Sequence, residues 1–144
     1  MPTFSFSASD LVEAGPALQV SVGPSRELIN IAAPRELRLA SPHPTMACID
    51  TGAQVTVVSP EVVSSLSLQP VGTAPINTPG AGQRLSCRRF HVNIYFAEDY
   101  VVENLFVIEA SMKGLPYQCL IGRDVLRLGM FFYMGKTNQF TLTF

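Results

Sequence analysis

Residues 49–58 read Ile49-Asp50-Thr51-Gly52-Ala53-Gln54-Val55-Thr56-Val57-Val58, an aspartate set between two apolar, β-prone runs. Because Val, Ile and Thr favour strands, the pattern predicts that Asp50 ends one strand and that the turn after it is made possible by Gly52. A carboxylate placed there is directed toward the interior, where its charge needs compensating partners. Asp-[Ser/Thr]-Gly arises by chance in roughly one chain in twenty of this length, so the tripeptide needs a second signal.

The second signal is a similar pattern near the C-terminus. Seventy residues after Gly52, two apolar residues again meet a glycine, in Leu120-Ile121-Gly122-Arg123-Asp124. The residues from Arg123 to Leu128 fit a short helix with an acidic first turn, which ends at Gly129. Between the two motifs, a glycine-rich segment separates strand-prone runs and predicts the tip of a hairpin: Thr78-Pro79-Gly80-Ala81-Gly82.

Elsewhere the chain consists of short β-prone runs separated by glycine and proline, which is typical of an all-β barrel or sandwich. Strands are expected at residues 18–22, 37–39, 90–96 and 101–108, with a terminal hairpin over residues 131–144. Two short helices are expected, at Ser59-Pro60 and at Arg123, and residues 26–33 fit another. Residues 1–15 are expected to be a loosely ordered arm, and residues 16–144 a single domain.

The composition limits the function. With 144 residues the chain can bury a core without disulfides or metal, and with 47% hydrophobic and 15% charged residues it reads as globular. A net charge of −1 gives no reason to expect nucleic acid or acidic lipid as a partner. No apolar run approaches the roughly 20 residues of a membrane span, and the first residues lack the basic start of a signal peptide.

The three cysteines, Cys48, Cys87 and Cys119, are an odd number without metal-ligand spacing. We therefore expect reduced thiols that act as small core residues, in a cytoplasmic protein with no metal and no cofactor. His43 and His91 are expected to be ordinary surface residues, since neither has a partner at catalytic or ligand spacing.

The paired motifs resemble those of the retropepsins, the single-lobed aspartic proteases of retroviruses and of their cellular and bacterial relatives. Residues 49–58 are similar to the active-site loop of that family and the strand after it. Gln54 at its position in this loop is similar to the sequence of the retrotransposon-derived cellular members. Residues 120–126 are similar to the second signature, whose glycine packs behind the loop and whose helix braces it. The resemblance covers roughly residues 19–144, and bacterial members also end in such a hairpin.

The resemblance implies a closed, mostly antiparallel β-barrel that works as a homodimeric aspartic endopeptidase on extended peptides. Asp50 would be the catalytic residue, one from each subunit, because the chain holds one Asp-Thr-Gly and is too short for two lobes. Thr51, Gly52 and Ala53 would support the loop. The hairpin tip at residues 78–82 would be the flap over the substrate, and the exposed edge of the terminal strand, residues 139–144, would form the dimer interface.

Viral members often carry an acid at the position of Gln54, which pairs with the arginine of the second signature. In this chain Arg123 cannot form that ion pair, so we expect it to bond to the loop backbone or to Gln54.

Several alternatives stay open. Asp50 could be a turn aspartate that caps its own loop, and a Cys–His protease built on Cys48 would need a specific basic partner. The domain could be a dimeric peptide-binding module that has lost turnover, or a structural or assembly domain without a peptide groove. The intact Asp-Thr-Gly argues against the binding module, because such a module has no evident need for a buried acid pair.

Overall fold

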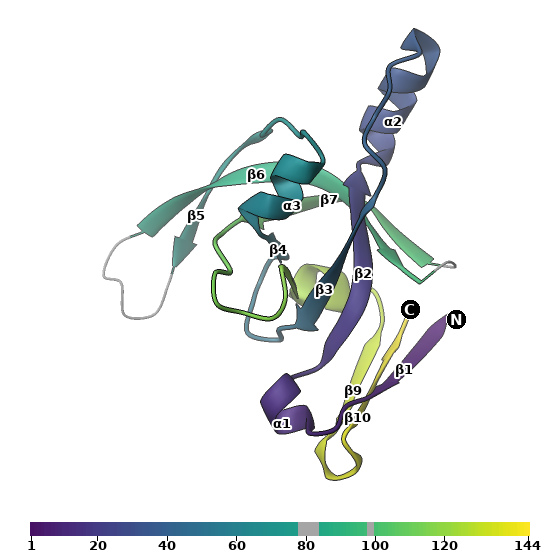
Figure 1. Cartoon of the computed structure of the whole chain (residues 1–144), viewed down its shortest axis with the longest axis vertical. Coiled ribbons are helices and arrows are strands. Elements are labelled where there is room, and N and C mark those ends of the chain that lie inside the picture. Colours follow the sequence, from purple (N-terminus) through teal and green to yellow (C-terminus); the bar gives the residue numbers. More distant parts are fainter. Residues whose placement is uncertain (78–83, 98–99) are drawn as a thin grey trace.

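In the computed structural model, which describes residues 1–77, 84–97 and 100–144, the chain forms a mostly-β domain built on a closed barrel (Figure 1). The barrel strands follow one another in a ring, and β2 pairs with β6 to close it. In ring order the strands are β2 (Ala17–Pro24), β3 (His43–Ile49), β8 (Cys119–Ile121), β4 (Val57–Val58), β7 (Tyr100–Glu109) and β6 (Arg84–Phe96). The pairs β3–β8 and β4–β7 are parallel and the other ring pairs are antiparallel, so the predicted barrel is confirmed and is mixed.

One face of β6 carries much of the core. Phe90, Val92, Ile94 and Phe96 are all fully or almost fully buried, as the two-residue period of this segment predicts. A β-bulge between Val92 and Ile94 interrupts the pairing of β6 with β7. Beyond the ring, β5 (Gly72–Asn77) pairs antiparallel with β6.

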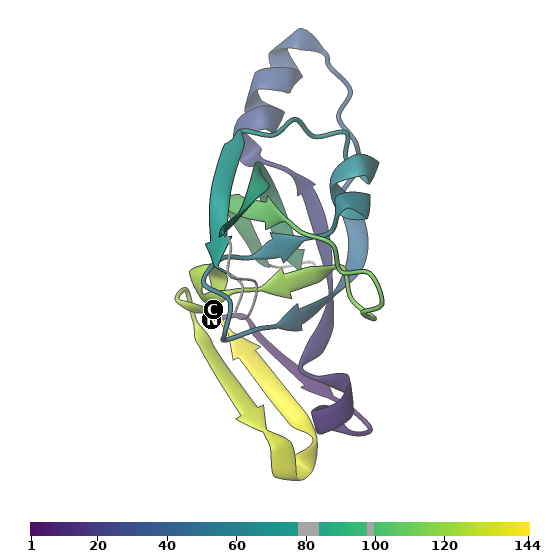
Figure 2. The same ribbon diagram turned by 90° about the vertical axis from the view of Figure 1, so that its left-hand side faces the viewer.

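A second sheet lies beside the barrel and has the strand order β1-β10-β9, all antiparallel (Figure 2). Its strands are β1 (Thr3–Ser7), β9 (Met130–Met134) and β10 (Gln139–Thr143). Phe140, Leu142 and Phe144 belong to the same buried cluster as the barrel residues. The terminal hairpin is therefore confirmed, and its apolar face packs on the barrel.

The N-terminus differs from the expected loosely ordered arm. Thr3–Ser7 is a strand paired with β10 over five residues, and α1 (Leu11–Ala14) begins at Asp10, whose carboxylate accepts a hydrogen bond from Val12 N. Phe4 and Phe6 pack against the core, while Thr3, Ser5 and Ser7 are exposed. Packing of these two rings fixes the segment to the sheet.

The described residues contain four α-helices rather than two. The expected helices are α3 (Pro60–Ser65) and α4 (Arg123–Leu126), and residues 26–33 also form a helix, α2 (Arg26–Ala32), continued by the 3-10 turn η1 (Ala33–Arg35). A second 3-10 turn, η2 (Gly135–Thr137), joins β9 to β10. The prediction of a strand at residues 37–39 is wrong. Residues 37–42 have no regular structure, and Leu37 is exposed.

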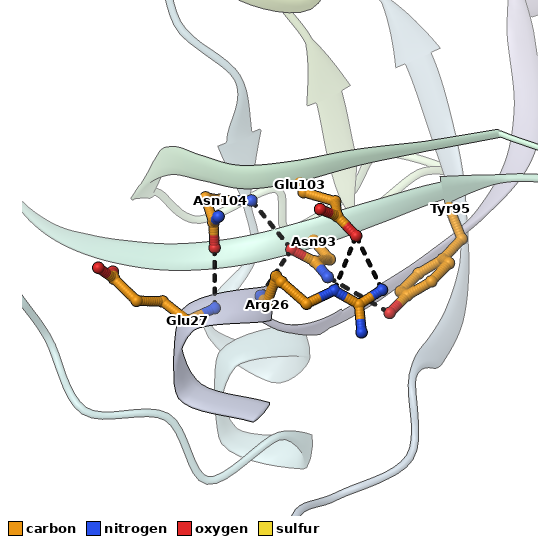
Figure 3. A network of polar contacts seen from close by, with 6 residues as sticks. All are labelled: Arg26, Glu27, Asn93, Tyr95, Glu103 and Asn104. Atoms are coloured by element: carbon orange, nitrogen blue, oxygen red, sulfur yellow. Dashed lines mark hydrogen bonds and ion pairs between the residues drawn. The ribbon is translucent and has the colours of Figure 1, made fainter. Parts of the chain in front are cut away.

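Helix α2 projects from the barrel and is held at its N-terminus by the side-chain amides of Asn93 and Asn104 (Figures 1 and 3). The side-chain oxygen of the fully buried Asn93 accepts hydrogen bonds from Arg26 N at 3.0 Å and from Asn104 N at 2.9 Å. Asn104 Oδ1 accepts from Glu27 N at 3.0 Å, and Arg26 pairs with Glu103 at 2.8 Å. These bonds satisfy N–H groups that the first turn of a helix leaves open.

Candidate active site

Asp50 lies directly after β3, where β3 runs parallel to β8. Its backbone N–H donates to the carbonyl oxygen of Ile121 at 2.9 Å, and Ala53 N donates to its carbonyl oxygen at 3.1 Å. One carboxylate oxygen, Oδ1, accepts from Gly52 N at 2.9 Å. The side chain is half-buried, so the loop fixes the carboxylate while leaving it accessible.

The second motif holds this loop from behind. Arg123 N donates to Ala53 O at 2.9 Å, and Asp124 N donates to Gln54 O at 3.2 Å. Gly122 is buried against the same segment, and a Cβ added to it would lie 2.6 Å from the carbonyl carbon of Val55. Only glycine allows this approach, so Leu120–Asp124 and Asp50–Ala53 meet as the spacing of the motifs suggests.

A buried threonine joins the two motifs, a contact that the sequence does not predict. Thr56 is fully buried, and both its N–H and its hydroxyl donate to the Asp124 carboxylate, at 2.9 and 2.7 Å. Its hydroxyl oxygen accepts from Gly122 N at 3.1 Å. The sequence signal is a threonine six residues after the aspartate, between two valines. A β-branched side chain in that position predicts a strand and does not reveal the partner of its hydroxyl.

Arg123 has a partner in the loop. Its guanidinium Nη1 donates to the carbonyl oxygen of Thr51 at 2.8 Å. Of the two alternatives that the sequence left open for Arg123, the backbone of the loop is the one with a hydrogen bond.

A groove of about 490 Å³ runs beside the loop, between it and the strands β5, β6 and β7. Its apolar walls include Val57, Ala74, Ile76 and Ile108, and its polar lining includes Gln54, Asn77, Arg89 and Arg123. The groove residues from β5, β6 and β7 are not among those that the sequence motifs predict for the site. In β5, Ala74 and Ile76 are partly buried between exposed neighbours, which identifies the face of β5 that lines the groove. This two-residue alternation can be interpreted only once β5 is known to be a strand.

The expected flap, Thr78-Pro79-Gly80-Ala81-Gly82, lies outside the described residues. The strands on either side of it, β5 and β6, pair antiparallel as far as Asn77 and Arg84. The role of this segment stays a prediction.

Cys48 lies two residues before Asp50, but its environment opposes nucleophilic chemistry. Burial, and then the charge of Asp50, raise the pKa of the Cys48 thiol, and Sγ faces the carbonyl oxygen of Ile49 at 3.7 Å. Since the thiolate is the nucleophilic form, the geometry disfavours a Cys–His protease. Burial raises the pKa of Cys119 to about 12.

His91 differs from the expected surface residue. Its Nδ1 lies 3.2 Å from a Glu27 carboxylate oxygen, its Nε2 lies 2.9 Å from Asn104 O, and its ring stacks on Phe106 with centroids 4.5 Å apart. Within the described ranges, no group of three or more His, Cys, Asp or Glu side chains could hold a metal ion. In the same ranges no helix has the length and apolarity of a membrane span.

Comparison with solved structures places this arrangement in a known fold. A retropepsin-like aspartic protease from Rickettsia conorii superposes with a TM-score of 0.51 over 98% of this chain and 91% of that one, at 12% identity. EIAV protease in complex with the inhibitor HBY-793 gives 0.49 over 83% and 92%, at 16% identity. The retroviral protease-like domain of Ddi1 from Leishmania major gives 0.46 over 87% and 86%, at 15% identity. The match to the Rickettsia structure shows that the fold of this chain is retropepsin-like.

The sequence comparison gives the family. A family model described as aspartyl protease matches residues 36–125, more than half of the chain, including both motifs and the strands between them. A search of curated proteins found no significant match. The chain belongs to this aspartyl protease family, and its fold is retropepsin-like.

Proposed function

We propose that the chain is an aspartic endopeptidase that cleaves extended peptides as a homodimer, with Asp50 of each copy forming the catalytic pair. The observation that carries the proposal is the position of Asp50. Its carboxylate is held by Gly52 N–H at the end of β3. The loop that carries it lines a groove through Gly52 and Ala53, in a chain of the aspartyl protease family.

In the proposed mechanism two Asp50 carboxyl groups share one proton, because like charges this close cannot both ionise. The ionised member accepts a proton from a water molecule, whose oxygen attacks the peptide carbonyl carbon. The protonated member donates its proton to the carbonyl oxygen, which gives a tetrahedral diol. Return of a proton to the amide nitrogen breaks the carbon–nitrogen bond, so this is general acid–base catalysis without a covalent intermediate.

The loop geometry supports this assignment of roles. The Gly52 N–H engages Oδ1, and among the described residues no hydrogen bond to Oδ2 is found. One oxygen would therefore fix the orientation of the carboxylate while the other meets the water or the second carboxyl group. Bonds from Arg123 and Asp124 to the loop backbone support its rigidity, which positioned catalytic groups require.

The dimer is proposed because the chain supplies one Asp-Thr-Gly. The interface expected at the edge of the terminal strand needs correction, since β10 pairs with β1 on one side and β9 on the other. The edge strands of this sheet are β1 and β9, and on β9 Met130, Phe132 and Met134 alternate along one face with 49%, 51% and 40% of their surface exposed. We assign the interface to β9, whose unpaired edge and apolar side chains suit a second copy.

The test compares the wild type with Asp50→Asn on a mixed peptide library, and mass spectrometry detects the cleaved peptides. Sedimentation measures the molecular mass, and therefore the oligomeric state, of each protein. The wild type is expected to cleave as a dimer, and the variant to stay dimeric and bind peptides without cleaving them. Equal inactivity of both proteins with retained peptide binding would establish the binding module instead. A monomer at high concentration that binds no peptide would favour a structural domain.

A further inference from the structure

The groove beside the active-site loop has an uneven charge. Two arginines, Arg89 and Arg123, line it, and none of its described lining residues is an aspartate or a glutamate. Arg123 donates to Thr51 O and is therefore part of the loop support. Arg89 has no ion pair with any carboxylate in the described part of the chain.

Arg88, the residue before Arg89 on β6, is neutralised by a carboxylate and serves as a comparison. Arg88 points to the other face by the two-residue period, and its guanidinium makes hydrogen bonds of 2.8 Å to both carboxylate oxygens of Glu109. Arg88 does not line the groove. Arg88 is thus a paired cation outside the groove, and Arg89 is an unneutralised cation that lines it.

Arg89 is also held in place. Its guanidinium carbon lies 4.6 Å from the ring centroid of Phe106, a groove residue, and this contact orients the cation without cancelling its charge. The Phe106 ring stacks in turn on His91, which is fixed by Glu27 and Asn104. A planar donor held in this way is prepared to bind a carboxylate through two hydrogen bonds.

We infer that the groove selects extended peptides carrying an Asp or Glu side chain that Arg89 binds, together with an apolar side chain packed against Val57, Ala74, Ile76 and Ile108. The inference rests on the proposed peptidase function. Because alternate side chains of an extended peptide face the same way, the acidic residue falls at an even spacing from the apolar one. A charged hydrogen-bonded pair of this kind corresponds to a preference of about tenfold over the neutral amide.

The first experiment measures cleavage of peptide sets in which Asp, Glu, Gln and Lys are exchanged at one position at a time. The wild type is expected to prefer Asp and Glu about tenfold over Gln at one position, and added salt should reduce the preference. Arg89→Gln should abolish the preference and Arg89→Glu should reverse it toward Lys. Lys136→Gln removes the same charge in the turn between β9 and β10, outside the groove, and should keep the wild-type profile. An acidic preference that survives in both Arg89 variants would overturn the inference.

The second experiment does not depend on hydrolysis. Binding of acidic peptides and their amide counterparts is measured by fluorescence anisotropy on Asp50→Asn, with and without Arg89→Glu. If the wild type cleaves nothing but the Arg89-dependent binding preference is found, the charge inference stands and the proposed function fails. If the wild type cleaves peptides without any Arg89-dependent preference, the inference fails alone. Should circular dichroism show that Arg89→Glu does not fold, Arg89→Gln decides the result.

Discussion

Arg123 reaches back across the site and donates from Nη1 to the carbonyl oxygen of Thr51 at 2.8 Å, so the residue after Asp50 is bonded to the first turn of α4. The backbone N–H of the same arginine donates to Ala53 O at 2.9 Å. Arg123 therefore forms hydrogen bonds to the loop backbone on both sides of Gly52. This bracing fixes the loop that carries the proposed catalytic carboxylate through hydrogen bonds to the loop backbone.

Replacing Arg123 tests this positioning role. Arg123→Ala keeps the backbone bond to Ala53 but loses the bond to Thr51 O, so we expect a drop in kcat of about 10- to 100-fold with little change in KM. Arg123→Lys is expected to recover part of the loss. The measurement is steady-state cleavage of a peptide found in the library screen.

Arg127→Ala, which removes an exposed arginine one turn later in the chain, is the matched control and should behave as the wild type. An Arg123→Ala protein with full kcat would show that the backbone bonds alone position the loop.

Gly122 should not tolerate a methyl group. In Gly122→Ala the added Cβ would lie 2.6 and 2.8 Å from the carbonyl carbon and oxygen of Val55, and relieving that overlap displaces backbone. We expect the free energy of unfolding to fall by about 1–3 kcal/mol, measured by urea titration. In the control Gly135→Ala the added methyl meets the ring of the exposed Tyr133 at 3.1 Å, which can move. Equal stability of the two variants would contradict the close packing.

Thr56 tests the buried link between the motifs. Thr56→Val keeps the shape of the side chain but leaves the Asp124 carboxylate and the Gly122 N–H each without one partner. We expect a loss of about 2–3 kcal/mol in the free energy of unfolding. Thr56→Ser retains the hydroxyl and should lose clearly less. The idea is wrong if the valine variant is as stable as the serine variant.

The contact between residues 50–53 and residues 120–124 could be predicted from the sequence. Each motif places a glycine at the end of a strand, where glycine permits close approach of another backbone, and both features are local to the motif. The Thr56–Asp124 link could not be predicted, because it depends on how β4, β8 and α4 are aligned in three dimensions. The same limit applies to the edge of the terminal strand. Its alternation gave the buried face of β10 correctly, but its occupied edges depend on β1, whose partner lies at the other end of the chain. Thr3–Ser7 alternates aromatic and hydroxyl residues, yet five such residues gave no indication of what they would pair with.

The β9 surface predicts how the dimer can be broken. Phe132→Asp places a charge at the centre of the exposed Met130–Phe132–Met134 face, and burying an unpaired carboxylate against a second copy is unfavourable. We expect the dimer dissociation constant to rise at least about tenfold, with peptide cleavage lost in parallel at low protein concentration. Sedimentation velocity across a dilution series measures the first effect. Val12→Asp, an equally drastic change at an exposed position of α1, should leave both unchanged, and an intact Phe132→Asp dimer would exclude β9 as the interface.

Cys119 predicts how stability changes at alkaline pH. Burial, with a smaller contribution from Asp124, raises the pKa of this thiol from 9.0 to about 12, so the folded protein keeps its proton in a range where the unfolded chain loses it. The stabilisation is fully present below pH 9.0 and is lost as the pH rises toward 12, by up to about 1.4 kcal/mol per pH unit. Urea titrations at several pH values between 8 and 11 should show a steeper decline for the wild type than for Cys119→Ala. Cys48 and Cys87, whose pKa values are also raised by burial, contribute to both proteins and cancel in the difference. Parallel declines would mean that Cys119 ionises in the folded state as readily as in the unfolded chain, and that β8 is open to solvent at this residue.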